Sequence, residues 1–192
     1  MMLIGLAGQA GSGKSTVANY LTEVRDYREV SLDEPIRAGL QAMLGLSAAD
    51  MTDRKAKETV IPWLGRSPRQ LMQTLGTEWG RQCVHGDLWL KLADRVVDYE
   101  RRHAARSGIE GVVVSDLRFD NEAEWLRGIG GQVWHLYPTN SPAHELPSGL
   151  AHPSEQGITR QDSDAGLINE FGRLDRLHRS IDEHLLRLLG LL

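Results

Sequence analysis

Cysteine is almost missing from this chain of 192 residues, since Cys83 is the single one. An internal disulfide and a metal site made only of cysteines are therefore excluded. We expect a reduced, cytoplasmic environment, where disulfides are rare. Long apolar runs are also missing: residues 1–7 are apolar but too few to cross a bilayer, and they lead directly into glycines. No basic segment of the kind that opens a secretory signal precedes them.

Neither sign of charge dominates. The 22 basic and 26 acidic residues leave a formal charge of −4, so a strong electrostatic grip on a nucleic-acid backbone is not expected, although a local basic patch stays possible. The hydrophobic share of 41% is ample for one core, which excludes a disordered chain. We expect a single domain that comprises residues 1–192.

The hydrophobic pattern predicts strands that alternate with helices. The expected strands are 2–7, 30–32, 111–116 and 132–137; the expected helices are 14–24, 35–43, one from 68 onward, 89–106, 120–128 and a closing one from 174. Such alternation is typical of an α/β fold with a parallel sheet flanked by helices on both faces. The polar segment 45–66 is expected to be a mobile acceptor-binding connection, and the proline-rich segment 138–160 a lid-like loop.

The helix that begins at Pro68 carries two different stripes. Leu71, Leu75 and Trp79 recur every four residues and are expected to face the core. A second stripe consists of Arg69, Gln73, Gly76, Thr77, Gly80 and Arg81. Two glycines cost a helix about 1 kcal/mol each, so either a ligand approaches this stripe closely, or another helix packs there, or the helix ends near Gly76.

A glycine-rich segment between the first strand and first helix carries the strongest signal. Residues 8–15 match G-x-x-x-x-G-K-[ST] at every fixed position, and this pattern predicts a P-loop that binds ATP. The glycines let backbone N–H groups turn toward phosphate oxygens. Lys14 is expected to reach the β- and γ-phosphates, and the Ser15 hydroxyl to bind Mg²⁺. The predicted ATP-binding residues are Gly8, Gly11, Ser12, Gly13, Lys14, Ser15 and Thr16.

A carboxylate near the metal is expected at the end of another apolar strand. Asp116 follows residues 112–115 directly and is the candidate, with a helix cap or turn as its alternative role. Arg118 suits a transferring phosphate, although a surface ion pair is the other possibility. The signatures of a guanine-nucleotide switch, D-x-x-G after this strand and N/T-K-x-D later, are absent. A small kinase remains.

Several segments together resemble the phage-type deoxynucleoside monophosphate kinases, a family of P-loop kinases. They are residues 5–14, 32–37 (LDEPIR), 69–81 (RQLMQTLGTEWGR), 114–122 (VSDLRFDNE) and 168–174 (INEFGRL). The resemblance implies the nucleotide-kinase version of the P-loop fold. It also implies transfer of the γ-phosphoryl group of ATP to the 5′-phosphate of a deoxynucleotide in the host cytoplasm, by an enzyme commonly assembled as a homodimer.

The resemblance also implies roles for individual residues. Lys14, Asp33 and Arg118 would be catalytic, and Ser15 with Asp116 would hold the metal. The acceptor would be bound by Asp33, Arg37, Arg69, Gln73, Glu78, Arg81 and Arg118. Members often have Asp-Pro after the second strand, whereas this chain has Asp33-Glu34-Pro35, which leaves open whether Asp33 or Glu34 faces the site.

Two other functions stay open. Related kinases phosphorylate 5-hydroxymethyl pyrimidines within phage DNA, and a hydroxyl acceptor would need Asp33 or Glu34 as general base and an accessible base. The charge of −4 favours a free nucleotide over DNA. A nucleotide-binding regulator without transfer activity is the third function.

Overall fold

The computed structural model describes residues 1–53, 55–139 and 157–192. Within it the chain forms two compact units. Unit 1 comprises Met1–Val30 and Val96–Leu192, and unit 2 comprises Ser31–Arg95. That the whole chain acts as one kinase domain stays a prediction.

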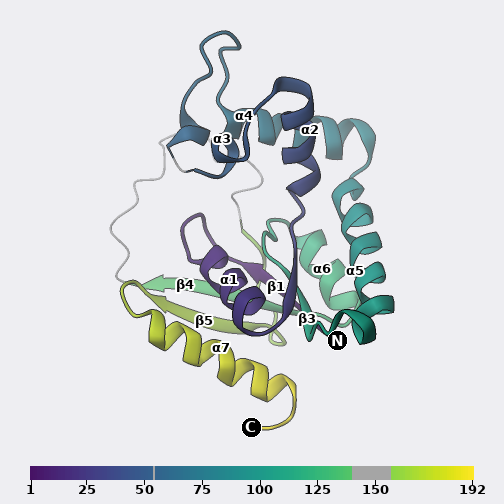
Figure 1. The fold of residues 1–192 in the computed structure, drawn as a ribbon, viewed down its shortest axis with the longest axis vertical. Helices are drawn as coiled ribbons and strands as arrows, with labels where there is room; N and C mark the ends of the chain where they lie inside the picture. Colours follow the sequence, from purple (N-terminus) through teal and green to yellow (C-terminus); the bar gives the residue numbers. More distant parts are fainter. Residues whose placement is uncertain (54, 140–156) are drawn as a thin grey trace. The chain divides into compact units, whose positions relative to one another are not determined.

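Unit 1 contains a five-stranded sheet in which all neighbouring strands are parallel (Figure 1). The strands are β1 (Met2–Ala7), β2 (Tyr27–Val30), β3 (Gly111–Val114), β4 (Gln132–Thr139) and β5 (Ala165–Glu170). Their order is β2-β3-β1-β4-β5, so β1 lies in the middle. Gly5 of β1 is paired with Val114 on one side and with Val133 on the other. The predicted α/β class is confirmed.

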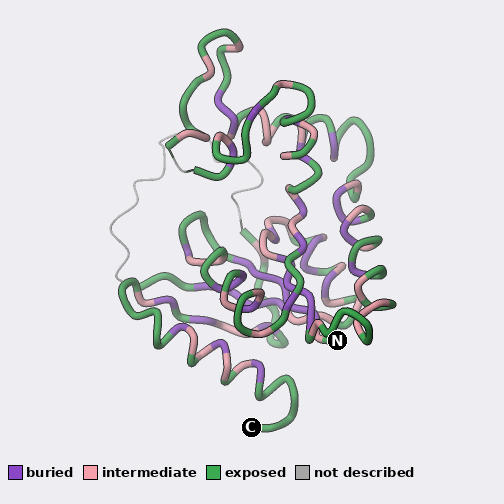
Figure 2. The backbone as a smooth tube through the Cα atoms, viewed as in Figure 1, coloured by how far each residue is buried: buried purple, intermediate pink, exposed green. Residues whose placement is uncertain are grey.

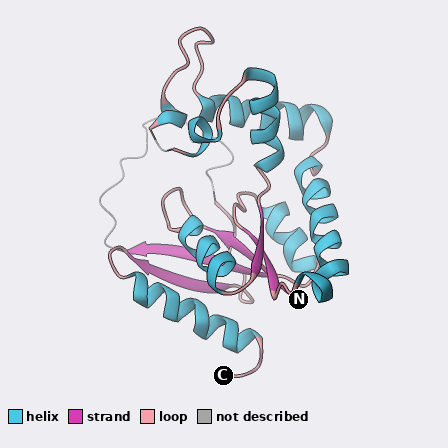
Figure 3. Cartoon of the chain, viewed as in Figure 1, coloured by secondary structure: helices cyan, strands magenta, loops and turns pink. Residues whose placement is uncertain are grey.

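Helices cover both faces of this sheet (Figure 3). The helices of unit 1 are α1 (Lys14–Val24), α6 (Asp120–Gly128), α7 (Leu174–Leu188) and the final part of α5 (Leu88–Ser107). On one face Ile4 and Leu6 pack in one cluster with residues of α1 and α7. On the other face a Cβ at Gly5 would lie 2.4 Å from a Leu126 methyl of α6, so this helix lies directly against β1. The strands are accordingly buried (Figure 2).

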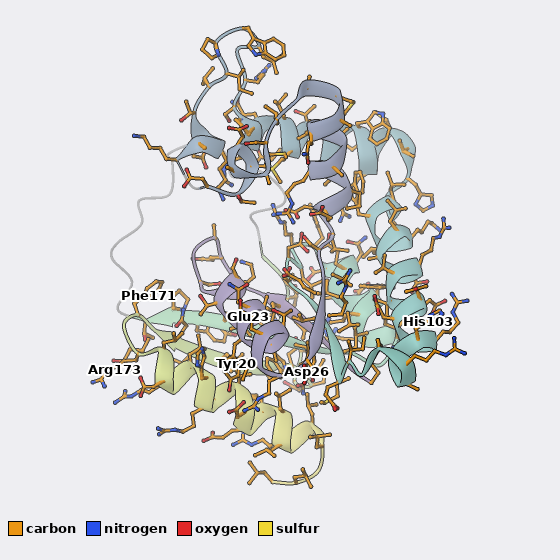
Figure 4. All side chains as sticks on the ribbon, viewed as in Figure 1. Tyr20, Glu23, Asp26, His103, Phe171 and Arg173 are labelled. Atoms are coloured by element: carbon orange, nitrogen blue, oxygen red, sulfur yellow. The ribbon has the colours of Figure 1, made fainter. Side chains whose placement is uncertain are left out.

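A polar cluster joins α1 to α7 at the surface of unit 1. The Tyr20 hydroxyl (labelled in Figure 4) donates to the Asp182 carboxylate at 3.0 Å, and the Tyr20 ring stacks on His178 with centroids 4.0 Å apart. Arg25 completes the cluster through an ion pair of 2.7 Å with Asp182. These contacts fix the helix that follows the P-loop against the closing helix.

Unit 2 is helical, with a small apolar core of its own. Its elements are α2 (Glu34–Leu44), α3 (Ala48–Thr52), η1 (Ala56–Glu58), α4 (Pro68–Gln73), η2 (Thr74–Val84) and the first part of α5. Ile36 and Leu40 of α2, Met51 of α3 and Trp89 of α5 form its buried cluster. Ser67 caps α4 and Gln70 returns the bond, a capping box. No helix of the described ranges is both long and apolar enough to cross a membrane.

The two glycines of the second stripe serve packing inside unit 2. A Cβ at Gly80 would lie 2.4 Å from the Trp89 ring, and one at Gly76 would lie 2.9 Å from Ile36 Cδ1. The Trp89 indole N–H also donates to the Gly76 carbonyl at 2.7 Å. Of the three explanations that the sequence leaves open, helix packing is therefore the one that the structure supports.

Trp79 does not face the core as the four-residue period predicts, because 49% of it is exposed. Residues 74–84 form a π-helix, whose i→i+5 hydrogen bonds widen the turn. The wider turn moves residue 79 off the stripe that Leu71 and Leu75 begin. Gly80 takes the inward position next to Trp89 instead.

Other differences concern the boundaries and number of elements. β2 occupies residues 27–30 instead of 30–32. Its central residues, Arg28 and Glu29, are charged and exposed, so the hydrophobic pattern does not indicate a strand there. β4 continues through Pro138 to Thr139. Short helices and one bridge between Ile61 and Arg66 occur where the sequence predicts only a connection. β5 was not predicted at all.

The Gly80–Trp89 contact predicts a packing effect on stability. We expect Gly80→Ala to lower the stability of the protein by about 1–3 kcal/mol, because the added methyl group overlaps the indole ring. For a chain of this size each kcal/mol lowers Tm by about 2–4 °C. Thermal unfolding followed by circular dichroism measures the change.

Gly86→Ala is the matched control, since nothing lies within 4 Å of a Cβ at that position. If Gly80→Ala kept the Tm of the control but weakened nucleotide binding, the glycine would serve a ligand and not the packing of the helix.

Candidate active site

The loop between β1 and α1 has the backbone that a phosphate-binding loop needs. Gly8, Gly11 and Gly13 have φ angles of 148°, 79° and 103°, a region that residues with a Cβ rarely adopt. A Cβ at Gly8 would also lie 2.7 Å from Ser12 Oγ and 3.0 Å from the carbonyl oxygen of Leu136. Glycine is therefore required there on two grounds. The loop can curl closely enough for its N–H groups to turn toward one ligand.

The first turn of α1 adds electrostatic attraction for an anion. Gly13 is the N-cap, no side chain caps the helix, and the first turn carries no acidic residue. The positive end of the helix dipole at this terminus therefore favours an anionic ligand. At α6, by contrast, buried Glu122 accepts bonds from the N–H groups of Arg118 (2.6 Å) and Phe119 (3.1 Å).

The side chains of the loop surround this backbone. The Lys14 ammonium donates to the carbonyl oxygens of Gly8 (2.6 Å) and Gln9 (2.9 Å), which holds it over the loop. Ser15 and Thr16 are exposed on the first turn of α1. The Ser12 hydroxyl is buried, and among the described residues it has no hydrogen-bond partner. These residues lie together on the loop and the first turn of α1, and their binding of ATP stays a prediction.

The carboxyl end of β3 lies beside the start of the loop. Val114 is paired with Gly5, and the Leu117 N–H donates to the Leu6 carbonyl at 3.2 Å. Asp116 is therefore placed at the edge of the sheet where β1 ends. Glu122 fixes the following turn by its bonds to the backbone of Arg118 and Phe119. The structure thus brings Asp116 and Arg118 to the same edge as the P-loop, within unit 1.

The donor set at this edge fits a magnesium ion. Hydroxyl and carboxylate oxygens, here of Ser15 and Asp116, are ligands that Mg²⁺ prefers, and this ion usually takes only one or two protein ligands beside waters and phosphates. The described part of the chain contains no group of three or more His, Cys, Asp or Glu residues that could enclose a metal.

Asp33 and Arg37 form an ion-pair cluster in unit 2. Arg37 lies 2.6 Å from Asp33 and 3.3 Å from Glu34, and its guanidinium donates to the Ser31 hydroxyl at 3.0 Å. Ser31 in turn donates to Asp33 at 2.6 Å. The Asp33 side chain is 13% exposed and that of Glu34 is 68% exposed. Both carboxylates thus face Arg37, but Asp33 is the one held in a fixed position.

The remaining predicted acceptor residues lie on α4 and η2, also in unit 2. Arg69 forms an ion pair with Glu58 of η1, and Arg81 donates to the Gly86 carbonyl at 3.2 Å. Gln73 is half-buried and Glu78 is exposed. α2 packs against α4, so these residues and Asp33 belong to one folded unit. Of the lid-like loop, residues 140–156 lie outside the described part of the chain.

Asn169 on β5 is a residue that the sequence analysis missed as part of this site. Its side-chain amide donates to the Ser12 carbonyl at 2.9 Å and lies where a Cβ of Gly13 would be, 2.3 Å away. In the sequence, residue 169 stands out only as part of segment 168–174, one of the segments that resemble the kinase family. The hydrophobic pattern gives no signal for it, because the buried residue is the polar Asn169 and the exposed one is the apolar Ile168.

Asp164 anchors the start of β5. It accepts hydrogen bonds from Arg127 at 2.6 and 3.0 Å, from the Gln161 N–H at 2.8 Å and from His135 at 3.0 Å. Burial raises the pKa of Asp164, but the bonds from Arg127, Gln161 and His135 outweigh it and hold the pKa below its usual value. The ionised form is therefore part of the fold.

A parallel sheet with a P-loop after its central strand, an acidic residue after the neighbouring strand and a helical second unit defines a P-loop phosphotransferase. The chain also matches the model of the family described as deoxynucleotide monophosphate kinase, over residues 55–181. The chain belongs to this family, and thus uses ATP to phosphorylate nucleotides.

Two viral proteins are similar to this chain over most of its length. A putative deoxynucleotide monophosphate kinase of Acanthamoeba polyphaga mimivirus is 32% identical over 167 residues, which cover 81% of each chain. The deoxynucleoside-5′-monophosphate kinase of Escherichia phage T5 is 24% identical over 243 aligned positions, which cover 92% of each. Among solved structures, a sugar kinase from Janibacter sp. HTCC2649 has a TM-score of 0.42 at 14% identity, covering 100% of this chain and 95% of that one.

The Asp164 cluster predicts how stability depends on pH. We expect Asp164→Asn to lower the free energy of unfolding at pH 7 by about 3–5 kcal/mol, because Arg127, whose side chain is only 14% exposed, would lose its ion-pair partner. Since the folded pKa is lowered, this contribution is present above the unfolded value of about 3.9 and is lost as the pH falls through the folded value. Urea unfolding at pH 7 and at pH 3 measures both effects.

Asp162→Asn is the control, because Asp162 is exposed two residues away. A difference between wild type and Asp164→Asn that stayed equal at both pH values would contradict the role of the ionised carboxylate.

Proposed function

We propose that this protein transfers the γ-phosphoryl group of magnesium-bound ATP to the 5′-phosphate of a deoxynucleoside monophosphate, yielding a diphosphate. The observation that carries the proposal is the P-loop, with its three positive-φ glycines, its uncapped helix and Lys14 over it. The family match supports the acceptor class.

Unit 1 is assigned to the phosphate donor. Backbone N–H groups of the P-loop and of the first turn of α1 bind the phosphates, and Lys14 neutralises charge on the β- and γ-phosphates. Arg118 is assigned to charge that spreads over the transferred group. Ser15 and Asp116 would hold Mg²⁺, which when bound would neutralise charge on the phosphates.

Unit 2 is assigned to the acceptor. Arg37, Arg69 and Arg81 provide cations for the monophosphate, and Gln73 and Glu78 provide polar contacts for the rest of the nucleotide. Asp33 is held by Ser31 and Arg37, and we propose that it orients Arg37 in the acceptor pocket. The homodimer implied by the resemblance stays a prediction and is needed for none of these roles.

A phosphate acceptor needs little base catalysis, because it is already ionised. Positioning and charge neutralisation supply most of the rate enhancement in such a transfer. The three arginines of unit 2 assigned to the acceptor and Lys14 of unit 1 suit such a reaction, because they can neutralise charge on the two phosphate groups.

The proposed reaction predicts which acceptor is phosphorylated. With γ-labelled ATP, we expect label transfer to one or more free deoxynucleoside monophosphates, and loss of transfer when EDTA removes Mg²⁺. The assay compares the deoxy- and ribonucleoside monophosphates with duplex DNA that contains 5-hydroxymethyl pyrimidine. Label found only in the DNA would establish the base-modifying function. ATP binding without transfer to any acceptor would indicate a regulator.

Lys14 is predicted to be essential for turnover and dispensable for folding. We expect Lys14→Ala to lower kcat by about 10³-fold or more, because a charged donor to the transferring group is lost. The steady-state rate with saturating ATP and acceptor measures the effect, and circular dichroism checks the fold. Lys91→Ala, at an exposed position on α5, is the control. Near-normal turnover of Lys14→Ala would contradict the assigned role.

A further inference from the structure

Asn169 of β5 contacts the P-loop at the peptide bond between Ser12 and Gly13. Only 8% of the residue is exposed, and its Nδ2 donates to the Ser12 carbonyl at 2.9 Å. The same nitrogen fills the space beside Gly13, where a Cβ would lie 2.3 Å away. Ser12 and Asn169 are 157 residues apart in the sequence. The contact is thus a product of the strand order, in which β5 lies next to β4.

Because a peptide bond is planar, this contact also determines the direction of the Gly13 N–H group. A trans peptide is planar, and its C=O and N–H point in opposite directions. No peptide of the described residues is cis. When Asn169 holds the Ser12 carbonyl, the N–H of Gly13 on the same peptide is turned away from β5, toward the other side of the loop.

The identity of residue 169 matters for this contact. Asparagine supplies an N–H donor to a carbonyl that would otherwise be unpaired, because the Ser12 carbonyl precedes the helix. An aspartate of the same shape would place an anionic acceptor against that carbonyl oxygen. Gly13, at φ 103°, supplies both the free space and the unusual backbone angle.

We propose that Asn169 is a positioning residue that directs the Gly13 N–H at a phosphate oxygen of the bound nucleotide. This inference rests on the proposed function, since it presupposes that the P-loop binds nucleotide phosphates. Asn169 itself acts through the backbone and does not touch the reacting atoms. Because β5 is anchored at its other end by Asp164, the contact belongs to a firmly held strand.

The test compares Asn169→Ala and Asn169→Asp with wild type in the full chain. Loss of one hydrogen bond that orients a phosphate ligand is expected to weaken binding of Mg²⁺-ADP about tenfold, with a larger loss for the aspartate. KM for ATP is expected to rise in parallel, while KM for the deoxynucleoside monophosphate stays within about twofold. Isothermal titration and steady-state kinetics measure these quantities. Asn19→Ala, at an exposed position on α1, is the control.

Melting temperatures without nucleotide separate positioning from a general structural role. We expect the nucleotide-induced rise in Tm to shrink in both Asn169 variants. If Asn169→Ala fails to fold, the nearly isosteric Asn169→Asp carries the same comparison. Wild-type affinity for Mg²⁺-ADP in both variants, or equal losses for ADP and for the acceptor, would overturn the inference. Absence of ADP binding in the wild-type protein would overturn the proposed function as well, which is a distinguishable result.

Discussion

The pairing of β1 with a parallel strand on each side is the constraint on which the site depends. Because β1 is central and buried on both faces, the position of its carboxyl end is fixed by β3 and β4. The glycine-rich loop must begin there, and Asp116 must follow β3 at the same edge. Ligand sites of open α/β sheets lie at this edge for the same reason. The chemistry is thus placed by backbone hydrogen bonds before any side chain contributes.

In unit 1, buried polar residues also occur outside the P-loop, at the start of β5 and within it. The Asp164 cluster holds β5 against α6 and β4, and β5 carries the amide that binds the Ser12 carbonyl. In a mostly apolar sheet such buried polar groups are costly unless they are paired. Here each of them is paired: Asp164 with Arg127, His135 and the Gln161 N–H, and Asn169 with the Ser12 carbonyl.

Several features were predictable because they depend on local sequence. The P-loop, the helix after it, the cap at Ser67 and the helix at 120–128 each follow from residues within one or two turns. Other features were not. Gly80 was ambiguous because its partner is Trp89, which begins another helix, and Trp79 was misplaced because the π-helix changes the period. β5 is not evident from the sequence because its two buried positions are Leu167 and Asn169 while Ile168 is exposed, which breaks the hydrophobic pattern.

From its residues alone, this chain was identifiable as an α/β P-loop kinase, because glycines, a lysine and a serine at fixed spacing have one dominant chemical use. Only the tertiary structure decided which carboxylate Arg37 holds most closely, what the helix glycines pack against, and that Asn169 supports the loop from 157 residues away. Those facts depend on which strands and helices become neighbours. Neighbours in space follow from how the whole chain buries its apolar surface, which no single segment encodes.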